Sequence, residues 1–304
     1  MTELTVDCFE SLCAEAPVST QLSQLDEHRS AALRRFWLLL LVGLVLGPLA
    51  AWMLIRADWP TAGLIVGAFL LIVPIIAGSA LLAAAGRALK IPVLDRIAVR
   101  AGMDYMATGF SPPVYPEASK ALFGTWLSSE VFTDLFHGKD HEGRGYAVYE
   151  ATLERRQGKS TYTVFSGQIY AFQRRRSASG ETVIVPDKGL FNWFTPGGGM
   201  ERVEIGDTDE AFEKKFEAYS TEPMEARTLL LDPELRRLLL DLREGGRTFL
   251  WLGGEDVMVA ATGKNRFEPG SMLRSTAGRD RVHAMLEDAC AAFATLKKLK
   301  AKLG

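Results

Sequence analysis

The segment His137–Glu142 (HGKDHE) combines residue types that can bind a metal ion. Histidine nitrogens and carboxylate oxygens are common metal ligands, and two histidines four residues apart would share one face of a helix. The glycines within and after the segment favour a loop instead, and no metalloprotease spacing is present. We therefore expect a polar turn that leads into a strand, with no metal or cofactor bound. The weak metal candidates are His137, Asp140, His141 and Glu142.

Two further clusters have residue types that could contact a partner. Three consecutive arginines close a predicted strand, where they could meet membrane phosphates or form a solvated edge that blocks strand addition. An aromatic run before several glycines could enter a lipid interface, grip a protein, or fold back onto the core. The alternatives stay open in each case. The candidate contact residues are Arg174, Arg175, Arg176, Phe191, Trp193 and Phe194.

Two uncharged apolar runs, Phe36–Ile55 and Ala62–Ala85, precede these clusters. Each is long enough, as a helix, to cross a hydrocarbon core of about 30 Å. The few residues between them allow only a tight turn, so we expect a transmembrane helical hairpin. A signal peptide would not be followed at once by a second full span, and a buried soluble hairpin would rarely lack charge throughout.

The charges beside these runs predict the topology. Arg34 and Arg35 precede the first run, and Arg87 and Lys90 follow the second, whereas the turn carries Arg56 alone. Positively charged flanks favour the cytoplasmic side, so we expect both termini there. Because neither run contains an ionisable residue, the hairpin is interpreted as an anchor and not as a transport pathway.

Small residues recur at four-residue spacing in both runs, at Gly43 and Gly47 and at Gly63 and Gly67. This spacing lets helix backbones approach closely. We expect these glycines to pack within the hairpin, with dimerisation through the Gly43 face as the alternative.

The remaining sequence predicts one α+β domain with a mixed, mainly antiparallel sheet. Stretches rich in β-branched and aromatic residues predict strands, and a Gly-Lys turn joins the first two. Pro92 is expected to end the second apolar helix, with a short new helix over 93–100. The C-terminal amphipathic helix could form a coiled coil or dock onto the domain. The predicted strands are 145–155, 161–173, 181–186, 201–205, 248–252 and 257–261. The predicted divisions are a helical segment 1–35, a hairpin 36–86 (spans 36–55 and 62–85), a linker 87–115, the α+β domain 116–275 and the C-terminal helix 276–304.

Charge and cysteine content exclude some classes of protein. The formal net charge is −2 over 304 residues, which provides no field to recruit nucleic acid. The three cysteines suit reduced cytoplasmic thiols and not a disulfide framework.

Several motifs then occur in an order known from one family. They include Phe165-Ser-Gly167, a Phe-x3-Phe-x2-Tyr-Ser stretch from Phe212 to Ser220, and Glu225-Ala-Arg227. Over about residues 35–265 the chain resembles the bacterial domain of unknown function 3137. The resemblance implies a two-span bacterial membrane protein with no established activity, and it carries over no catalytic residue. The C-terminal helix and the segment before the spans lie outside the shared pattern.

Together these features favour a non-catalytic protein- or lipid-interaction module anchored in the bacterial inner membrane. The expected partners are the lipid bilayer and another membrane or cytoplasmic protein, or a second copy of the chain. The alternatives are a membrane-anchored metal-dependent hydrolase and an accessory subunit of a membrane transport or assembly complex.

Overall fold

A computed structural model describes residues 5–16, 18–187, 199–204, 209–274 and 276–304. The chain divides into two compact units. Unit 1 contains Ala98–Arg266 and Ala289–Gly304; unit 2 contains Thr5–Ile97 and Phe267–Asp288. Each unit is described by itself.

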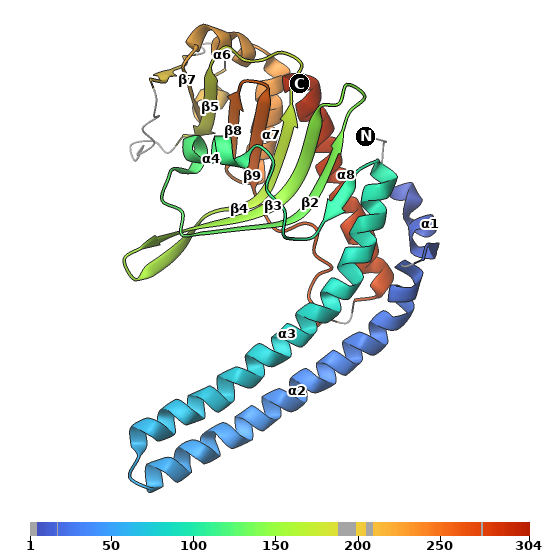
Figure 1. The fold of residues 1–304 in the computed structure, drawn as a ribbon, viewed down its shortest axis with the longest axis vertical. Coiled ribbons are helices and arrows are strands. Elements are labelled where there is room, and N and C mark those ends of the chain that lie inside the picture. The colour runs from blue at the N-terminus through green and yellow to red at the C-terminus, as the bar shows by residue number, and fades with distance from the viewer. Residues whose placement is uncertain (1–4, 17, 188–198, 205–208, 275) are drawn as a thin grey trace. The chain divides into compact units, whose positions relative to one another are not determined.

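Unit 1 is built on an antiparallel sheet of nine strands, in the order β1-β2-β3-β4-β9-β8-β5-β7-β6 (Figure 1). The α+β class and the mainly antiparallel sheet are thereby confirmed. The strands are β1 (Asp104–Met106), β2 (Ser129–Lys139), β3 (Gly145–Gln157), β4 (Ser160–Gln173), β5 (Glu181–Pro186), β6 (Glu201–Arg202), β7 (Phe216–Ser220), β8 (Thr248–Gly253) and β9 (Asp256–Thr262).

The two longest strands, β3 and β4, form the predicted hairpin. Gln157 pairs with Ser160, so the loop has two residues, and Gly158 has a φ of 63°. A two-residue hairpin loop of this kind needs positive φ, which glycine adopts without steric cost.

Helix α4 (Tyr115–Phe123) covers one face of this sheet. Tyr115, Leu122 and Phe123 are buried with Tyr149 and Phe165 in the main hydrophobic core. This side is called the α4 face below.

The C-terminal part of helix α8 (Gly278–Leu303) covers the opposite face, called the α8 face (Figure 1). The rings of Phe136 and Phe293 meet edge to face with centroids 5.2 Å apart. Leu296 and Leu299 are completely buried. Of the two alternatives for this helix, docking onto the domain is the one that the structure adopts.

Three shorter helices lie in the described part of unit 1: α5 (Glu210–Glu213), α6 (Pro223–Leu230) and α7 (Pro233–Glu244). Helix α7 starts directly after Asp232, with Pro233 in its first turn. The Asp232 carboxylate accepts hydrogen bonds from the backbone N–H groups of Glu234 and Leu235, which satisfies donors that a helix start leaves unpaired.

Unit 2 contains the short helices η1 (Val6–Cys8) and α1 (Phe9–Ala14), then the long helices α2 (Val18–Arg56) and α3 (Pro60–Ala101), which run antiparallel as a hairpin (Figure 1). The last four residues of α3 belong to unit 1. Both long helices are long and apolar enough to cross a membrane.

The side chains of this hairpin are largely exposed. Only 11% of the most apolar window of each helix is buried, and Leu41 and Phe69 are 61% and 64% exposed. Monomeric soluble proteins rarely expose apolar surface of this extent, so a non-aqueous surrounding is the physical expectation.

The prediction that Pro92 ends the second helix is wrong. Helix α3 continues without a break through both Pro74 and Pro92 to Ala101. An interior proline removes one backbone hydrogen bond but does not have to end a helix. Leu89, Val93 and Ile97 are completely buried around Pro92, and their burial offsets that loss.

Candidate ligand-binding site

A pocket of about 940 Å³ lies on the α4 face of unit 1, where β1, β2, β3, β4 and β9 meet the segment before α4. Its volume falls at the upper end of the range typical of small-molecule sites. The pocket is built from residues far apart in the sequence.

Small residues make the floor of the pocket hollow. Ala147 on β3 pairs with Ala171 on β4, and Gly145 precedes them at the start of β3. Paired residues of neighbouring antiparallel strands lie side by side on the same face. A floor of alanine and glycine leaves a space that larger side chains would fill.

The same strand register places polar side chains in the pocket. His137 on β2 pairs with Ala147, and Asp104 on β1 pairs with His137, so both lie on the α4 face. Lys139, two residues after His137 on β2, pairs with Gly145. All of these residues line the pocket. Asp104 and Lys139 are exposed, whereas His137 is half-buried.

Gln173 and Asp256 close the pocket on the β4 and β9 side. They pair across the two strands, and the Gln173 side-chain oxygen accepts a hydrogen bond from the Gly145 N–H at 3.0 Å. Burial and the charges of Glu117 and Glu255 raise the pKa of Asp256, although a hydrogen bond with Gln173 lowers it in part. The Asp256 carboxyl is therefore within electrostatic range of two further carboxylates, of which Glu117 belongs to the opposite wall.

The segment 109–117 forms the opposite wall. The Tyr149 hydroxyl donates a hydrogen bond to the Pro113 carbonyl at 2.9 Å, and the ring of Phe110 meets that of Tyr149 at 6.1 Å. Val114 then takes a φ of 65°, which is uncommon for a β-branched residue, immediately before α4 begins. These contacts hold the wall across the sheet face.

The four weak metal candidates are divided between this pocket and the β2–β3 turn. His137 lines the pocket. Asp140 lies in the turn, where Oδ1 accepts hydrogen bonds from the backbone N–H groups of Glu142 and Arg144, both at 3.0 Å. Its Oδ2 accepts from the Arg144 guanidinium at 2.9 Å and from Lys300 Nζ at 3.3 Å.

These bonds determine the ionisation of Asp140. Burial alone would raise its pKa, but the hydrogen bonds from Arg144, Glu142 and Lys300 outweigh burial and hold the pKa well below its usual range. Lys300 also lies over the Tyr146 ring, 4.4 Å from its centroid. Asp140 thus joins the turn to α8, and the basic end of α8 contacts unit 1 itself at this position.

The other two candidates lie at the surface of the turn. His141 is 79% exposed, and its Nε2 is 3.3 Å from a Glu142 oxygen. Glu142 also contacts the guanidinium groups of Arg144 and Arg175, the latter at 2.7 Å. In the described residues, Glu142 therefore serves as the acceptor of two arginines.

The arginine cluster follows β4 as expected. The Arg174 backbone N–H donates to the Glu255 carbonyl at 2.8 Å, Arg175 pairs with Glu142, and Arg176 is exposed. A contact of these arginines with lipid stays a prediction. The aromatic candidates Phe191, Trp193 and Phe194 lie outside the described residues.

The four glycines of the hairpin face the opposite helix. An added Cβ would lie 2.9 Å from the Leu70 carbonyl at Gly43 and 2.9 Å from the Gly67 carbonyl at Gly47. At Gly63 it would lie 2.9 Å from the Ala51 carbonyl, and at Gly67 it would lie 2.8 Å from Ala51 Cβ. Side chains larger than glycine would push α2 and α3 apart.

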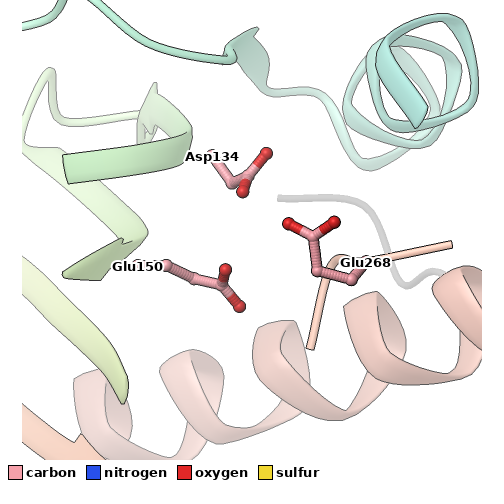
Figure 2. Close-up of side chains that lie close together, drawn as sticks. All are labelled: Asp134, Glu150 and Glu268. Atoms are coloured by element: carbon pink, nitrogen blue, oxygen red, sulfur yellow. The ribbon is translucent and has the colours of Figure 1, made fainter. Parts of the chain in front are cut away.

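Two buried carboxylates on the α8 face, Asp134 and Glu150, were not singled out from the sequence. Figure 2 shows them on β2 and β3, and their oxygens approach within 4.8 Å. The Tyr105 hydroxyl donates to Asp134 at 2.7 Å, and the Arg266 N–H donates to Glu150 at 2.6 Å. Asp134 has a φ of 57° at a register shift in β2, which accounts for its inward direction.

The sequence analysis also did not predict the pocket. One signal for it is visible: alternate residues of 145–151 read Gly, Ala, Tyr, Ala, and those between read Tyr, Val, Glu. A strand with small residues on one face indicates a close approach or a hollow there. Asp104, Glu117 and Asp256 carry no local signal, because only the folded sheet brings them together.

Comparisons with known proteins give one family and one solved structure. The model of the family described as "Protein of unknown function (DUF3137)" matches residues 163–301. No curated protein matches the chain. The crystal structure of the mycobacterial trehalose monomycolate transport factor A, TtfA, is similar over 69% of this chain and 92% of that chain, with 13% identity and a TM-score of 0.39.

The family match confirms the resemblance found in the motifs and corrects its extent. The match starts at residue 163 and continues through most of α8, which the motif comparison had left out. The likeness to TtfA is too low to carry a function. Over residues 163–301, the chain is similar to the DUF3137 family.

Proposed function

We propose that the chain is a membrane-anchored binding protein. The α2–α3 hairpin crosses the bacterial inner membrane, both termini are cytoplasmic, and the sheet of unit 1 binds a small ligand with an apolar part in the pocket on its α4 face. Binding, and not chemistry on the ligand, is the function in this proposal.

The anchor rests on the length and exposure of the hairpin. Its two helices have 39 and 42 residues, and their apolar side chains are exposed along the spans. Arg34, Arg35 and Arg87 flank the spans at the ends of the hairpin, and Arg56 stands alone at the turn, which supports cytoplasmic termini.

The pocket is the observation that carries the binding function. An apolar hollow with a few polar groups at its edge is the usual form of a ligand site. Here Leu135, Ala147 and Ala171 supply apolar lining, and Asp104 and Asp256 supply polar groups. Such a composition orients a ligand with one polar and one apolar end.

The environment of Asp140 and Glu142 favours binding over metal-dependent hydrolysis. A metal ion at Asp140 would have to displace Arg144 and Lys300, and at Glu142 it would compete with Arg144 and Arg175. Charge-assisted bonds of this kind are among the stronger hydrogen bonds in proteins. The cluster is accounted for as the support of the β2–β3 turn.

A neutral probe tests the pocket. Titration calorimetry would measure hexan-1-ol binding to the full chain in lipid nanodiscs, with two pocket-filled variants, Ala147→Leu and Met106→Trp, as references. Partition of the alcohol into lipid is the same for all three samples and cancels. We expect a saturable heat for the wild type that both variants lose.

Equal binding by the wild type and both filled variants would contradict the proposal. The two variants are independent, because Ala147 is buried on the floor and Met106 is 41% exposed on β1. The anchor is checked separately by carbonate washing of membranes. The protein should stay with the lipid, and release into the wash would contradict the anchor.

A further inference from the structure

We propose that the ligand of this pocket is a small amphiphilic amine, with a cationic head and an apolar body. The inference rests on the proposed binding function and adds the chemical class of the ligand. It follows from the charges that line the pocket and from where each of them lies.

Carboxylates outnumber cations in the lining. Asp104, Glu117 and Asp256 come from β1, α4 and β9, and Lys139 is the one lysine or arginine among the described residues that line the pocket. The three carboxylates are contributed by separate elements, so a cation in the pocket can approach them from different sides. An anionic ligand would meet net negative charge.

The carboxylates are available to a ligand. Asp104 and Glu117 are exposed and form no salt bridge with another described residue. Asp256 is half-buried, and the hydrogen bond that it shares with Gln173 is to a neutral amide. By contrast, the carboxylates of the β2–β3 turn are already paired with arginine and lysine.

Asp256 and Glu117 also act on each other. The charge of Glu117 is one of the causes that raise the pKa of Asp256, so the two carboxylates repel. A cation bound beside them would relieve this repulsion.

The apolar part of the ligand fits the floor. The row Asp104, His137, Ala147, Ala171 places a carboxylate at one end and two alanines at the other, on adjacent paired strands. An ammonium group at Asp104 or Glu117 would therefore leave its carbon chain over Ala147 and Ala171. The charged rim and the apolar floor together favour a ligand that has a cationic group and an apolar chain.

Three six-carbon probes of different charge test the inference: hexylammonium, hexan-1-ol and hexanoate. Their binding to the full chain in nanodiscs would be measured by calorimetry at pH 7, with Ala147→Leu and Met106→Trp as references. We expect hexylammonium to bind about tenfold more tightly than hexanoate, a preference of about 1.4 kcal/mol, with hexan-1-ol between them.

Charge variants then locate the preference. Asp104→Asn and Glu117→Gln should each reduce the affinity for hexylammonium about threefold or more and reduce that for hexan-1-ol by a smaller factor, because the lost negative charge acts most strongly on the charged probe. Glu213→Gln, at an exposed carboxylate on α5 away from the pocket lining, is the matched control and should change neither.

The outcomes separate this inference from the proposed function. Equal affinities for the three probes, all lost in the filled variants, would overturn the amine and leave the binding function standing. Binding that the filled variants do not alter would overturn both. Binding of the peptide acetyl-Leu-Lys-Leu-amide without binding of hexylammonium would overturn the small amine in favour of a protein segment.

Discussion

The two faces of the sheet in unit 1 differ in side-chain size at neighbouring positions of the same strands. On β3, Tyr146 and Val148 point to the α8 face, where Lys300 covers the Tyr146 ring. Gly145 and Ala147, which alternate with them, point to the α4 face and line the pocket. At these positions the α8 face is filled by a helix, whereas the α4 face leaves a pocket beside α4. In the proposed function, the residues of one face serve stability and the residues that alternate with them serve binding.

Glycine also appears where the filled face requires it. Gly138 on β2 pairs with Tyr146, and an added Cβ would lie 2.8 Å from the Tyr146 hydroxyl. The tyrosine ring therefore lies across the glycine, under Lys300. On the α4 face, Gly145 has more room, because an added Cβ there would lie 3.7 Å from Gln173 Oε1.

The largest expected effect comes from emptying the filled face. Phe293→Ala removes the ring that packs on Phe136, and we expect a loss of about 3–5 kcal/mol in the free energy of unfolding. Denaturant titration of the full chain in detergent would measure it. Ala294→Ser, at the next and exposed position, is the control. A loss below about 1 kcal/mol for Phe293→Ala would contradict tight packing of α8 on the sheet.

The next contrast is between the stability costs of placing a larger side chain on each face of the sheet. Ala292 on α8 is completely buried, so Ala292→Leu should overpack and cost about 1–3 kcal/mol. Ala147→Leu extends into the pocket, and we expect it to cost less than about 1 kcal/mol. Thermal unfolding of the two variants side by side measures the difference. If Ala147→Leu were as costly as Ala292→Leu, the α4 face would not be hollow.

The turn that leads to the filled face gives a smaller, pH-dependent effect. Asp140→Asn removes the charge that Arg144 and Lys300 share, at a cost of about 1–2 kcal/mol near pH 7. The pKa of Asp140 is lowered on folding, so its stabilisation is complete above its unfolded value of about 3.8 and is lost as the pH falls from there toward the folded value.

Urea titrations at pH 7 and at about pH 3 check this sign. The difference between the wild type and Asp140→Asn should be smaller at about pH 3 than at pH 7, and Glu213→Gln should follow the wild type at both. A difference that grows in acid would show that Asp140 is not held as a charged acceptor.

The smallest expected effect on stability is at the pocket rim. Asp104→Asn and Glu117→Gln replace exposed side chains, and each should change the free energy of unfolding by less than about 0.5 kcal/mol. Urea titration of the ligand-free chain measures this. A loss comparable with that of Asp140→Asn would mean that these carboxylates support the fold and are not reserved for a ligand.

Much of the fold was predictable because its signals are local. Short stretches of sequence contain the signals for the alternation in β3 and β4, for the two-residue turn at Gly158 and for the capped start of α7 at Asp232. The long apolar runs of α2 and α3 are equally local. The family motifs added the order of these elements.

The missed elements depend on contacts that are distant in sequence. Strand β2 carries Asp134 at a bulge and Gly138 near its end, which obscures its pattern, and β1 has only three residues. The pocket requires the register of five strands and the path of segment 109–117. No single stretch of sequence contains that information, so Asp104, Glu117 and Asp256 could not be grouped in advance.

Thiol labelling tests the contrast between the two faces most directly. His137 lines the pocket. Val148 pairs with Phe136, the neighbour of His137 on β2, and is completely buried on the α8 face. His137→Cys and Val148→Cys would be placed in the full chain with Cys8, Cys13 and Cys290 replaced by alanine. The labelling rate with a small methanethiosulfonate reagent would then be measured. The account predicts rapid labelling at position 137, slowed by hexylammonium, and protection at position 148 until the protein unfolds. Equal rates at the two positions would contradict it.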